Sequence, residues 1–175
     1  MQILLYFLIV LGGLVALILV ISAMMPAAYA IKAETTINAP AAKVHDHIAD
    51  LNHYRDWNPW QKMEPASSQK VEGTPHTIGH KYSWEGKKIG AGCLTLTSNT
   101  PEQEVKFKLE FFKPFKSVAA DEWKFEGDQK STKVTWSNHG PLAWPMARLM
   151  GPMIIKQLNQ QFAEGLKNLK ELCEK

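Results

Sequence analysis

The first 31 residues carry no charged side chain, and this constrains the chain more than any other feature. All 20 lysines and arginines and all 17 aspartates and glutamates lie from Lys32 onward. Within the uncharged segment, the 21 residues from Ile3 to Ala23 are almost entirely apolar. As an α-helix they would extend about 31 Å, which matches the hydrocarbon core of a bilayer. The sequence therefore predicts a single transmembrane anchor within residues 1–26, ended by Pro26.

A cleaved signal peptide is the alternative interpretation of this segment. Ala28-Tyr29-Ala30 resembles a small-x-small cleavage site. However, no basic residue precedes the apolar run, which is longer than the roughly 7–15 residues of a signal peptide. A retained anchor is therefore favoured. Because Lys32 and Lys43 follow the span and nothing basic precedes it, the positive-inside tendency predicts a cytoplasmic location for the rest of the chain.

Residues 31–175 have the length of one domain and contain no internal repeat or linker. Residues 31–38 show the alternation and β-branching of a strand. Pro40 suits the first turn of a helix, where a missing N–H costs nothing, and residues 40–52 carry apolar side chains at helical spacing. A second short helix or turn is expected at residues 53–57, before Pro59.

Apolar and polar side chains alternate through the centre of the chain. The clearest alternation runs from Val105 to Phe111, where lysines and a glutamate separate the apolar residues. Short turn sequences separate the alternating runs, so the pattern predicts an antiparallel meander with one solvated face. The residues expected to alternate on strands are Ile78, His80, Tyr82 and Trp84; Leu94 and Leu96; Val105, Phe107, Leu109 and Phe111; Trp123 and Phe125; and Thr132, Val134 and Trp136.

The C-terminal segment predicts a long amphipathic helix. Its apolar residues recur every three or four positions and form one stripe. Gly151-Pro152 is expected to separate this helix from a short piece around residues 142–150. Gly165 lies inside the helix at a cost of about 1 kcal/mol relative to alanine, which predicts that a backbone or ligand comes close there. The stripe consists of Met150, Ile154, Leu158, Phe162, Leu166, Leu169 and Cys173.

This order of elements predicts an α+β fold. A first strand is followed by short helices, about six further strands and the long helix. One curved antiparallel sheet of about six to seven strands must wrap around the last helix, because no other element can cover the apolar faces of both. A space between the sheet and this helix, roofed by the short helices, is the expected cavity.

Several segments of residues 31–172 resemble the polyketide cyclase/dehydrase-like branch of the START-like (SRPBCC) superfamily. The similarity rests on the order and spacing of motifs rather than on one diagnostic motif. It implies the helix-grip fold and a hydrophobic cavity between sheet and C-terminal helix. The superfamily contains aromatase/cyclases, lipid carriers, coenzyme Q-binding proteins and cochaperone-like modules, so the resemblance does not fix an activity. The matching segments are Ile37-Asn38-Ala39-Pro40, Val44, Ile48-Ala49-Asp50-Leu51, Trp57-Asn58-Pro59-Trp60, residues 79–86, residues 132–136 and residues 162–170.

Aromatic and aliphatic side chains expected around this cavity form the candidate ligand-binding set. They suit a flat or elongated apolar ligand, whose orientation tryptophan N–H and tyrosine O–H groups would fix. The alternative is that they simply fill a core. The candidates are Trp57, Trp60, Tyr82, Trp84, Phe107, Phe111, Trp123, Trp136, Met150, Ile154 and Leu158.

No catalytic motif or metal motif stands out. His45 and His47 flank Asp46, but residues two apart on a helix point in different directions and cannot share an ion, so surface positions are expected. His80, Asp121 and Asn138 fall at strand positions that point inward on some registers, where a polar group could act as general acid or base. Four residues near the expected cavity mouth either orient a polar ligand group or pair locally: Asp50, Tyr54, Arg55 and Asp56.

Charge and cysteine content exclude other classes of function. The net charge is only +3, and the lysines alternate with apolar or acidic residues, so no contiguous basic face for nucleic acid is expected. Cys93 and Cys173 are far apart in sequence, which predicts free buried thiols and no metal site or cofactor.

Three functional hypotheses remain at this stage. The leading hypothesis is a membrane-anchored binding or carrier module for a hydrophobic small molecule or lipid. The alternatives are a cyclase/dehydratase-like enzyme that uses the same cavity, and a cochaperone-like interaction domain with a filled core and no ligand.

Overall fold

The structure is a computed structural model that describes residues 2–175. Met1, the first residue of the predicted anchor, lies outside the described residues. The helices are α1 (Gln2–Met24), α2 (Ala41–Ala49), α3 (Tyr54–Trp57), α4 (Trp60–Met63) and α5 (Met146–Cys173). The strands are β1 (Ala28–Ile37), β2 (Ser68–Glu72), β3 (Lys81–Glu85), β4 (Ala91–Thr100), β5 (Glu104–Lys113), β6 (Ser117–Gly127) and β7 (Thr132–Pro141).

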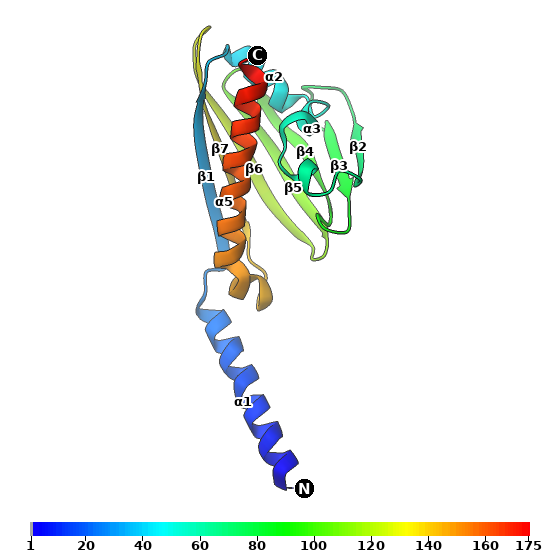
Figure 1. The fold of residues 1–175 in the computed structure, drawn as a ribbon, viewed down its shortest axis with the longest axis vertical. Helices are drawn as coiled ribbons and strands as arrows, with labels where there is room; N and C mark the ends of the chain where they lie inside the picture. Colours follow the sequence, from blue (N-terminus) through cyan, green and yellow to red (C-terminus); the bar gives the residue numbers. More distant parts are fainter. Residues whose placement is uncertain (1) are drawn as a thin grey trace.

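The seven strands form one antiparallel sheet in the order β1-β7-β6-β5-β4-β3-β2. Strands β2 to β7 therefore form a meander, and the last strand, β7, pairs with the first strand, β1. The sheet curves around α5, which lies along β1 and β7, while α2 and α3 cover the upper part of the same face (Figure 1). The predicted α+β architecture of a helix gripped by a curved sheet is confirmed.

Alternation along the strands produces the core, as the period-two pattern predicts. In β7, Val134 and Trp136 are buried while Lys133 between Thr132 and Val134 is exposed. The ring of Trp136 stacks on Phe162 of α5, with centroids 3.7 Å apart. The ring of Trp136 also stacks on the ring of Trp123, with centroids 4.3 Å apart. Each such aromatic pair contributes about 0.5–1.5 kcal/mol beyond simple burial, so this stack fixes the helix against the sheet.

Gly165 explains how closely α5 approaches this stack. A Cβ atom at this position would lie 2.9 Å from Cζ3 of Trp136 and 3.3 Å from Cδ of Pro59. The predicted close approach is therefore confirmed, and the neighbouring group is an indole ring. Only a residue without a side chain fits at this point of the helix.

The predicted break at Gly151-Pro152 is wrong. Helix α5 runs through both residues from Met146 to Cys173. Proline removes one backbone donor, which costs stability in a helix interior but does not abolish the helix where tertiary packing supports it. Gly151 supplies such packing, because it is buried close to a methyl carbon of Leu142.

Met150 does not continue the inner stripe of α5 and is 42% exposed. Residues four apart on an α-helix are rotated by about 40° relative to each other. Over the three such steps that separate Met150 from Phe162 the rotation reaches about 120°. A stripe of four-residue steps therefore drifts off the buried face, and Gly151 takes the inner position instead.

Two further details differ from the prediction. Strand β2 was not expected, because its sequence is largely polar. It is the outer strand of the sheet and pairs only with β3. Ile78, expected on a strand, precedes β3 and is 74% exposed. In both cases the pattern failed where a segment has contacts on one side only.

Helix α1 projects away from the domain at the end opposite the C-terminus (Figure 1). It has a mean hydropathy of 3.1 over its most apolar 18 residues, none of which is buried by the rest of the chain. By length and composition it can cross a membrane, and a signal sequence has the same properties. Its last turn contacts the domain, because the hydroxyl of Ser22 donates a hydrogen bond of 2.8 Å to the carbonyl oxygen of Pro145.

Candidate functional site

A cavity of about 290 Å³ lies between the sheet and α5, where the sequence predicts one. Residues from all seven strands form one wall, α5 the opposite wall, and α3 and α4 the roof. Most of the lining is aromatic or aliphatic. The lining residues are Tyr29, Tyr54, Asn58, Trp60, Gln61, Gln69, Tyr82, Trp84, Ile89, Leu94, Leu109, Phe111, Ser117, Asp121, Trp136, Asn138, Pro141, Leu142, Ala147, Ile154, Leu158 and Phe162.

A buried carboxylate forms the polar part of this lining. Asp121 of β6 is 4% exposed. Its Oδ1 accepts a hydrogen bond of 2.9 Å from Nε1 of Trp123, and its Oδ2 accepts one of 2.8 Å from Nε1 of Trp136. Oδ2 also accepts a bond of 3.1 Å from Nδ2 of Asn138, and Oδ1 of Asn138 in turn accepts a bond of 2.7 Å from the hydroxyl of Tyr29. These five residues form the polar cluster of the cavity.

Burial raises the pKa of Asp121 to about 6, although its three hydrogen-bond donors favour the charged form. At neutral pH the group is mainly ionised. Among the ion pairs of the described residues, none involves Asp121. A perturbed carboxylate of this kind, held by neutral donors in a largely apolar cavity, is typical of a functional site.

Three tyrosines near the cluster remain protonated over the whole physiological range. Burial raises the pKa of Tyr29 to about 12, and the charge of Asp121 adds to this effect. Burial also raises the pKa of Tyr82 to about 12 and that of Tyr54 well above its usual value. The cavity therefore offers hydroxyl groups that donate or accept hydrogen bonds, and one carboxylate that accepts them.

The structure brings most of the sequence candidates to the cavity. Four candidates do not line it. Trp57 and Trp123 are each 1% exposed and pack edge to face, with ring centroids 5.5 Å apart, in the core behind the cavity. Phe107 is also buried outside the lining, and Met150 points outward. The candidates that line the cavity are Trp60, Tyr82, Trp84, Phe111, Trp136, Ile154 and Leu158.

Sequence reasoning passed over several lining residues. Tyr29 was considered only as part of a cleavage site, yet it lies two residues before the buried Ile31 in β1, so strand alternation could have placed it inward. Leu142 and Ala147 lie in residues 142–150, which were expected to form a short piece separate from the last helix. Gln61 and Gln69 had no signal, because α4 and β2 lack a clear pattern.

His80 is fully buried but does not line the cavity. Its Nε2 lies 3.0 Å from the backbone nitrogen of Leu51, which donates to it, and its Nδ1 lies 3.1 Å from the carbonyl oxygen of Glu72. The ring therefore joins the start of β3 to the α2–α3 connection through Nε2 and to the end of β2 through Nδ1. This arrangement fits a structural role and leaves no ring nitrogen free for a ligand.

The surface position expected for His45 is wrong. His45 is 6% exposed, contacts Oδ1 of Asn99 at 2.7 Å and packs against the rings of His76 and Phe125. Its neighbour His47 is only half-buried. Among residues 2–175, no group of three or more histidine, cysteine or acidic side chains is arranged to hold a metal ion.

The family described as polyketide cyclase / dehydrase and lipid transport matches residues 29–174. The chain belongs to this family. The match begins at the second residue of β1 and ends one residue after α5, so it covers nearly the whole sheet, the cavity and α5. No protein with a curated description matches the sequence.

Solved structures share the fold at low sequence identity. Protein CV1439 from Chromobacterium violaceum is 16% identical, with a TM-score of 0.63 over 83% of this chain and 97% of its own. The Zhui aromatase/cyclase from Streptomyces sp. R1128 is 14% identical, with a TM-score of 0.61 over 84% of this chain and 94% of its own. The Aha1 dimer from Colwellia psychrerythraea is 15% identical, with a TM-score of 0.57 over 83% and 96%. These similarities establish the helix-grip fold.

Proposed function

We propose that the protein is a membrane-anchored module that binds or carries a hydrophobic small molecule in the cavity between the sheet and α5. The observation that carries this proposal is the cavity itself, which is mainly apolar and has one polar cluster at its wall. The family, whose description includes lipid transport, supports the same class of ligand. The cavity also exceeds the water-sized voids that a filled interaction domain would contain.

The size of the cavity limits the ligand. Its volume of about 290 Å³ lies at the lower limit of the range of roughly 300–1,000 Å³ that is typical of small-molecule sites. This favours a compact ligand, with one ring system or one short chain, over a whole two-chain phospholipid. Asp121 would accept a hydrogen bond from a hydroxyl or amine group of such a ligand, because one lone pair of its Oδ1 is not used by Trp123.

Helix α1 would hold the domain at the membrane. Its length and hydropathy support a span, and an apolar ligand is concentrated in the same bilayer. Tethering the cavity to the bilayer raises the effective concentration of the ligand at the site. The cytoplasmic side remains a prediction that rests on Lys32 and Lys43.

Binding is tested with the full chain, purified in detergent and freed of lipid by exchange. We expect native mass spectrometry to detect a retained small molecule after incubation with a membrane lipid extract, and the apolar probe N-phenyl-1-naphthylamine to fluoresce on binding. Leu158→Trp replaces an aliphatic side chain of the cavity lining with a larger indole. It should weaken probe binding by about tenfold or more, the equivalent of about 1.4 kcal/mol.

Gln157→Trp is the matched control, since Gln157 is the exposed neighbour of Leu158 on α5. It adds the same ring outside the cavity and should leave probe binding unchanged. If both variants bind the probe as the parent does, or if the parent binds nothing, the proposal is wrong.

A second function is supported by the pKa of Asp121. A carboxyl group with a pKa of about 6 at a cavity wall is suited to remove a proton from a carbon next to a carbonyl group, as a cyclase- or dehydratase-like reaction requires. Asp121→Asn separates the two functions. With this substitution both a carrier and an enzyme still bind apolar probes. Only an enzyme has a turnover to lose.

A further inference from the structure

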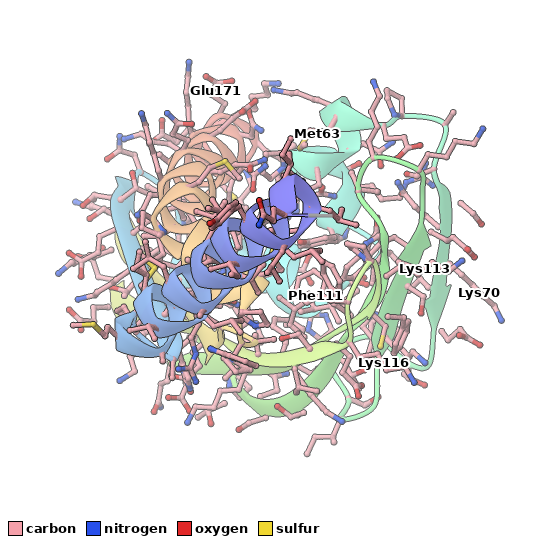
Figure 2. The ribbon with its side chains drawn as sticks, turned by 90° about the horizontal axis from the view of Figure 1, so that it is seen from below. Met63, Lys70, Phe111, Lys113, Lys116 and Glu171 are labelled. Carbon is pink, nitrogen blue, oxygen red and sulfur yellow. The ribbon has the colours of Figure 1, made fainter. Side chains whose placement is uncertain are left out.

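Several chain segments meet at the end of the sheet from which α1 departs. Here β1 begins at Ala28, its partner β7 ends at Pro141, and β6 begins at Ser117. The end of β5 with the turn to β6, residues 112–116, and the start of α5 therefore lie at the same end. Figure 2 views the molecule from this side and shows Phe111 near the middle, with Lys113 and Lys116 to the right.

Exposed apolar side chains concentrate at this end of the domain. Among residues 25–175, nine large apolar side chains are exposed, and six of them lie in residues 112–115 or residues 144–153. Such a concentration differs from the scattered exposure that is normal for a soluble surface. The six are Phe112 (50% exposed), Phe115 (70%), Trp144 (52%), Met146 (57%), Met150 (42%) and Met153 (56%).

The opposite end of the sheet has a different character. Its turns, residues 100–104 and 127–132, contain Glu102, Glu104 and Asp128 and no large apolar residue. Ile78 is the exception, with an exposed fraction of 74% in the loop before β3. The contrast between the two ends shows that the apolar surface is specific to the α1 end.

Basic side chains accompany the exposed apolar residues. Lys113 at the end of β5 and Lys116 lie on either side of Phe115, and Arg148 lies in the first turn of α5. Glu85 pairs with Lys113 at 2.6 Å, while Lys116 has no ion-pair partner among the described residues. Aromatic residues beside lysine and arginine are typical of segments at the boundary between water and lipid, where rings enter the interface and cations contact headgroups.

The contact between α1 and the domain sets the depth of this surface. The Ser22 hydroxyl donates to the carbonyl oxygen of Pro145, and the backbone N–H of Leu142 donates to the carbonyl oxygen of Ala27 over 2.8 Å. Ser22 belongs to the apolar segment that would lie in the bilayer. Trp144 and Met146, on either side of Pro145, therefore lie level with the end of the span.

The cavity reaches the same end of the domain. Phe111, Ser117, Pro141 and Ala147 line it and keep partial or full exposure, whereas Asp121 at its polar cluster is buried. Part of the accessible lining thus lies between the end of β5 and the start of α5, while Trp60, Gln61 and Gln69 keep partial exposure on the side of α4 and β2. We propose that these two segments, residues 112–116 and 144–153, dock on the lipid interface of the bilayer that holds α1, so that the cavity opens onto lipid.

This proposal rests on the proposed function but is tested separately from ligand binding. Full-length Phe115→Cys and Ile78→Cys variants are labelled with an environment-sensitive fluorophore and reconstituted in vesicles of phosphatidylcholine and phosphatidylglycerol. The native Cys93 and Cys173 are buried, and burial raises the pKa of both thiols, so the introduced cysteine reacts selectively.

The label at position 115 should shift its emission to the blue and be quenched by lipids with brominated acyl chains. The label at position 78 should remain in water, although Ile78 is equally apolar and exposed. A label at position 115 that stays in water overturns the proposal, even where the protein binds its ligand. A label in lipid with an empty cavity supports the docking surface and contradicts the proposed function instead.

A second variant measures the opening of the cavity. Phe112→Asp with Phe115→Asp places two charges on the docking surface, and we expect transfer of the apolar probe from vesicles to the protein to slow by about tenfold or more, the partitioning effect of one buried aromatic ring. Binding of the same probe from detergent solution should be unchanged. Equal transfer rates for parent and variant would show that the ligand enters elsewhere.

Discussion

Replacement of Asp121 by asparagine should change the pH dependence of stability in a defined direction. Burial raises the pKa of this carboxyl from 3.8 in the unfolded chain to about 6 in the fold. Below pH 3.8 both states are protonated, and the group makes no difference to their balance. Between pH 3.8 and 6 the unfolded state releases the proton first, so the free energy of unfolding falls as the pH rises. Above pH 6 the loss is complete.

The size of this loss follows from the two pKa values. A tenfold change in proton affinity corresponds to about 1.4 kcal/mol, so the difference between 3.8 and about 6 amounts to about 3 kcal/mol. No reduction for solvent screening applies, because Asp121 is 4% exposed. Asparagine cannot ionise, but its amide leaves Trp123 or Trp136 without its present acceptor, at a cost of about 1–3 kcal/mol at every pH.

The measurement is denaturant unfolding of the detergent-solubilised full chain at several pH values from about 4 to 7. Relative to the parent, Asp121→Asn should gain about 3 kcal/mol over this range, because the parent alone loses stability through this group. Asp128→Asn is the control that should run parallel to the parent over this range, since backbone N–H groups of Lys130 and Ser131 lower the pKa of Asp128 below 3.8 and leave it ionised in both states. Parallel pH curves for the parent and Asp121→Asn would refute the raised pKa of the buried carboxyl.

Two further outcomes are expected from the packing of the core. Gly165→Ala should lower the free energy of unfolding by about 1–3 kcal/mol through overlap with Trp136, partly offset by a gain of about 1 kcal/mol in helix propensity. Thermal unfolding measures the net loss. An unchanged melting temperature would show that the indole moves aside. Cys93 and Cys173 should react with a thiol reagent only on unfolding, because both are buried and the pKa of Cys173 is raised to about 11. Rapid reaction of either cysteine in the folded protein would contradict the packing of its surroundings.

The sequence predicts the sheet and the last helix well because these elements bury one regular face. The alternation from Val105 to Leu109 in β5 and the stripe from Leu158 to Cys173 in α5 both arise from contact with a single core. The family resemblance adds the arrangement of the elements, which periodicity alone does not determine. Residues of the cavity that lie on these faces, such as Tyr82 and Leu158, were accordingly identified.

The remaining residues depend on geometry that periodicity does not contain. Trp123 and Trp136 are cross-strand partners and follow the same alternation, yet only Trp136 lines the cavity. Trp136 stacks on Phe162 of α5, whereas Trp123 on the neighbouring strand packs against Trp57 in the core, and alternation does not distinguish the two strands. Met150 is displaced because the rotation of a helix accumulates along a stripe of four-residue steps. His45 is buried because the loop of His76 and the turn at Asn99 cover it, and neither is evident from the helix sequence.

The connection between α1 and β1 has a consequence for how far the ligand travels. Only residues 25–27 separate the two elements, which allows a reach of roughly 10 Å even when fully stretched. With α1 in a bilayer, the domain would lack the reach to ferry its cargo across a gap to another membrane. Exchange would instead be confined to the plane of one leaflet, and any recipient protein would have to diffuse to the domain along that plane.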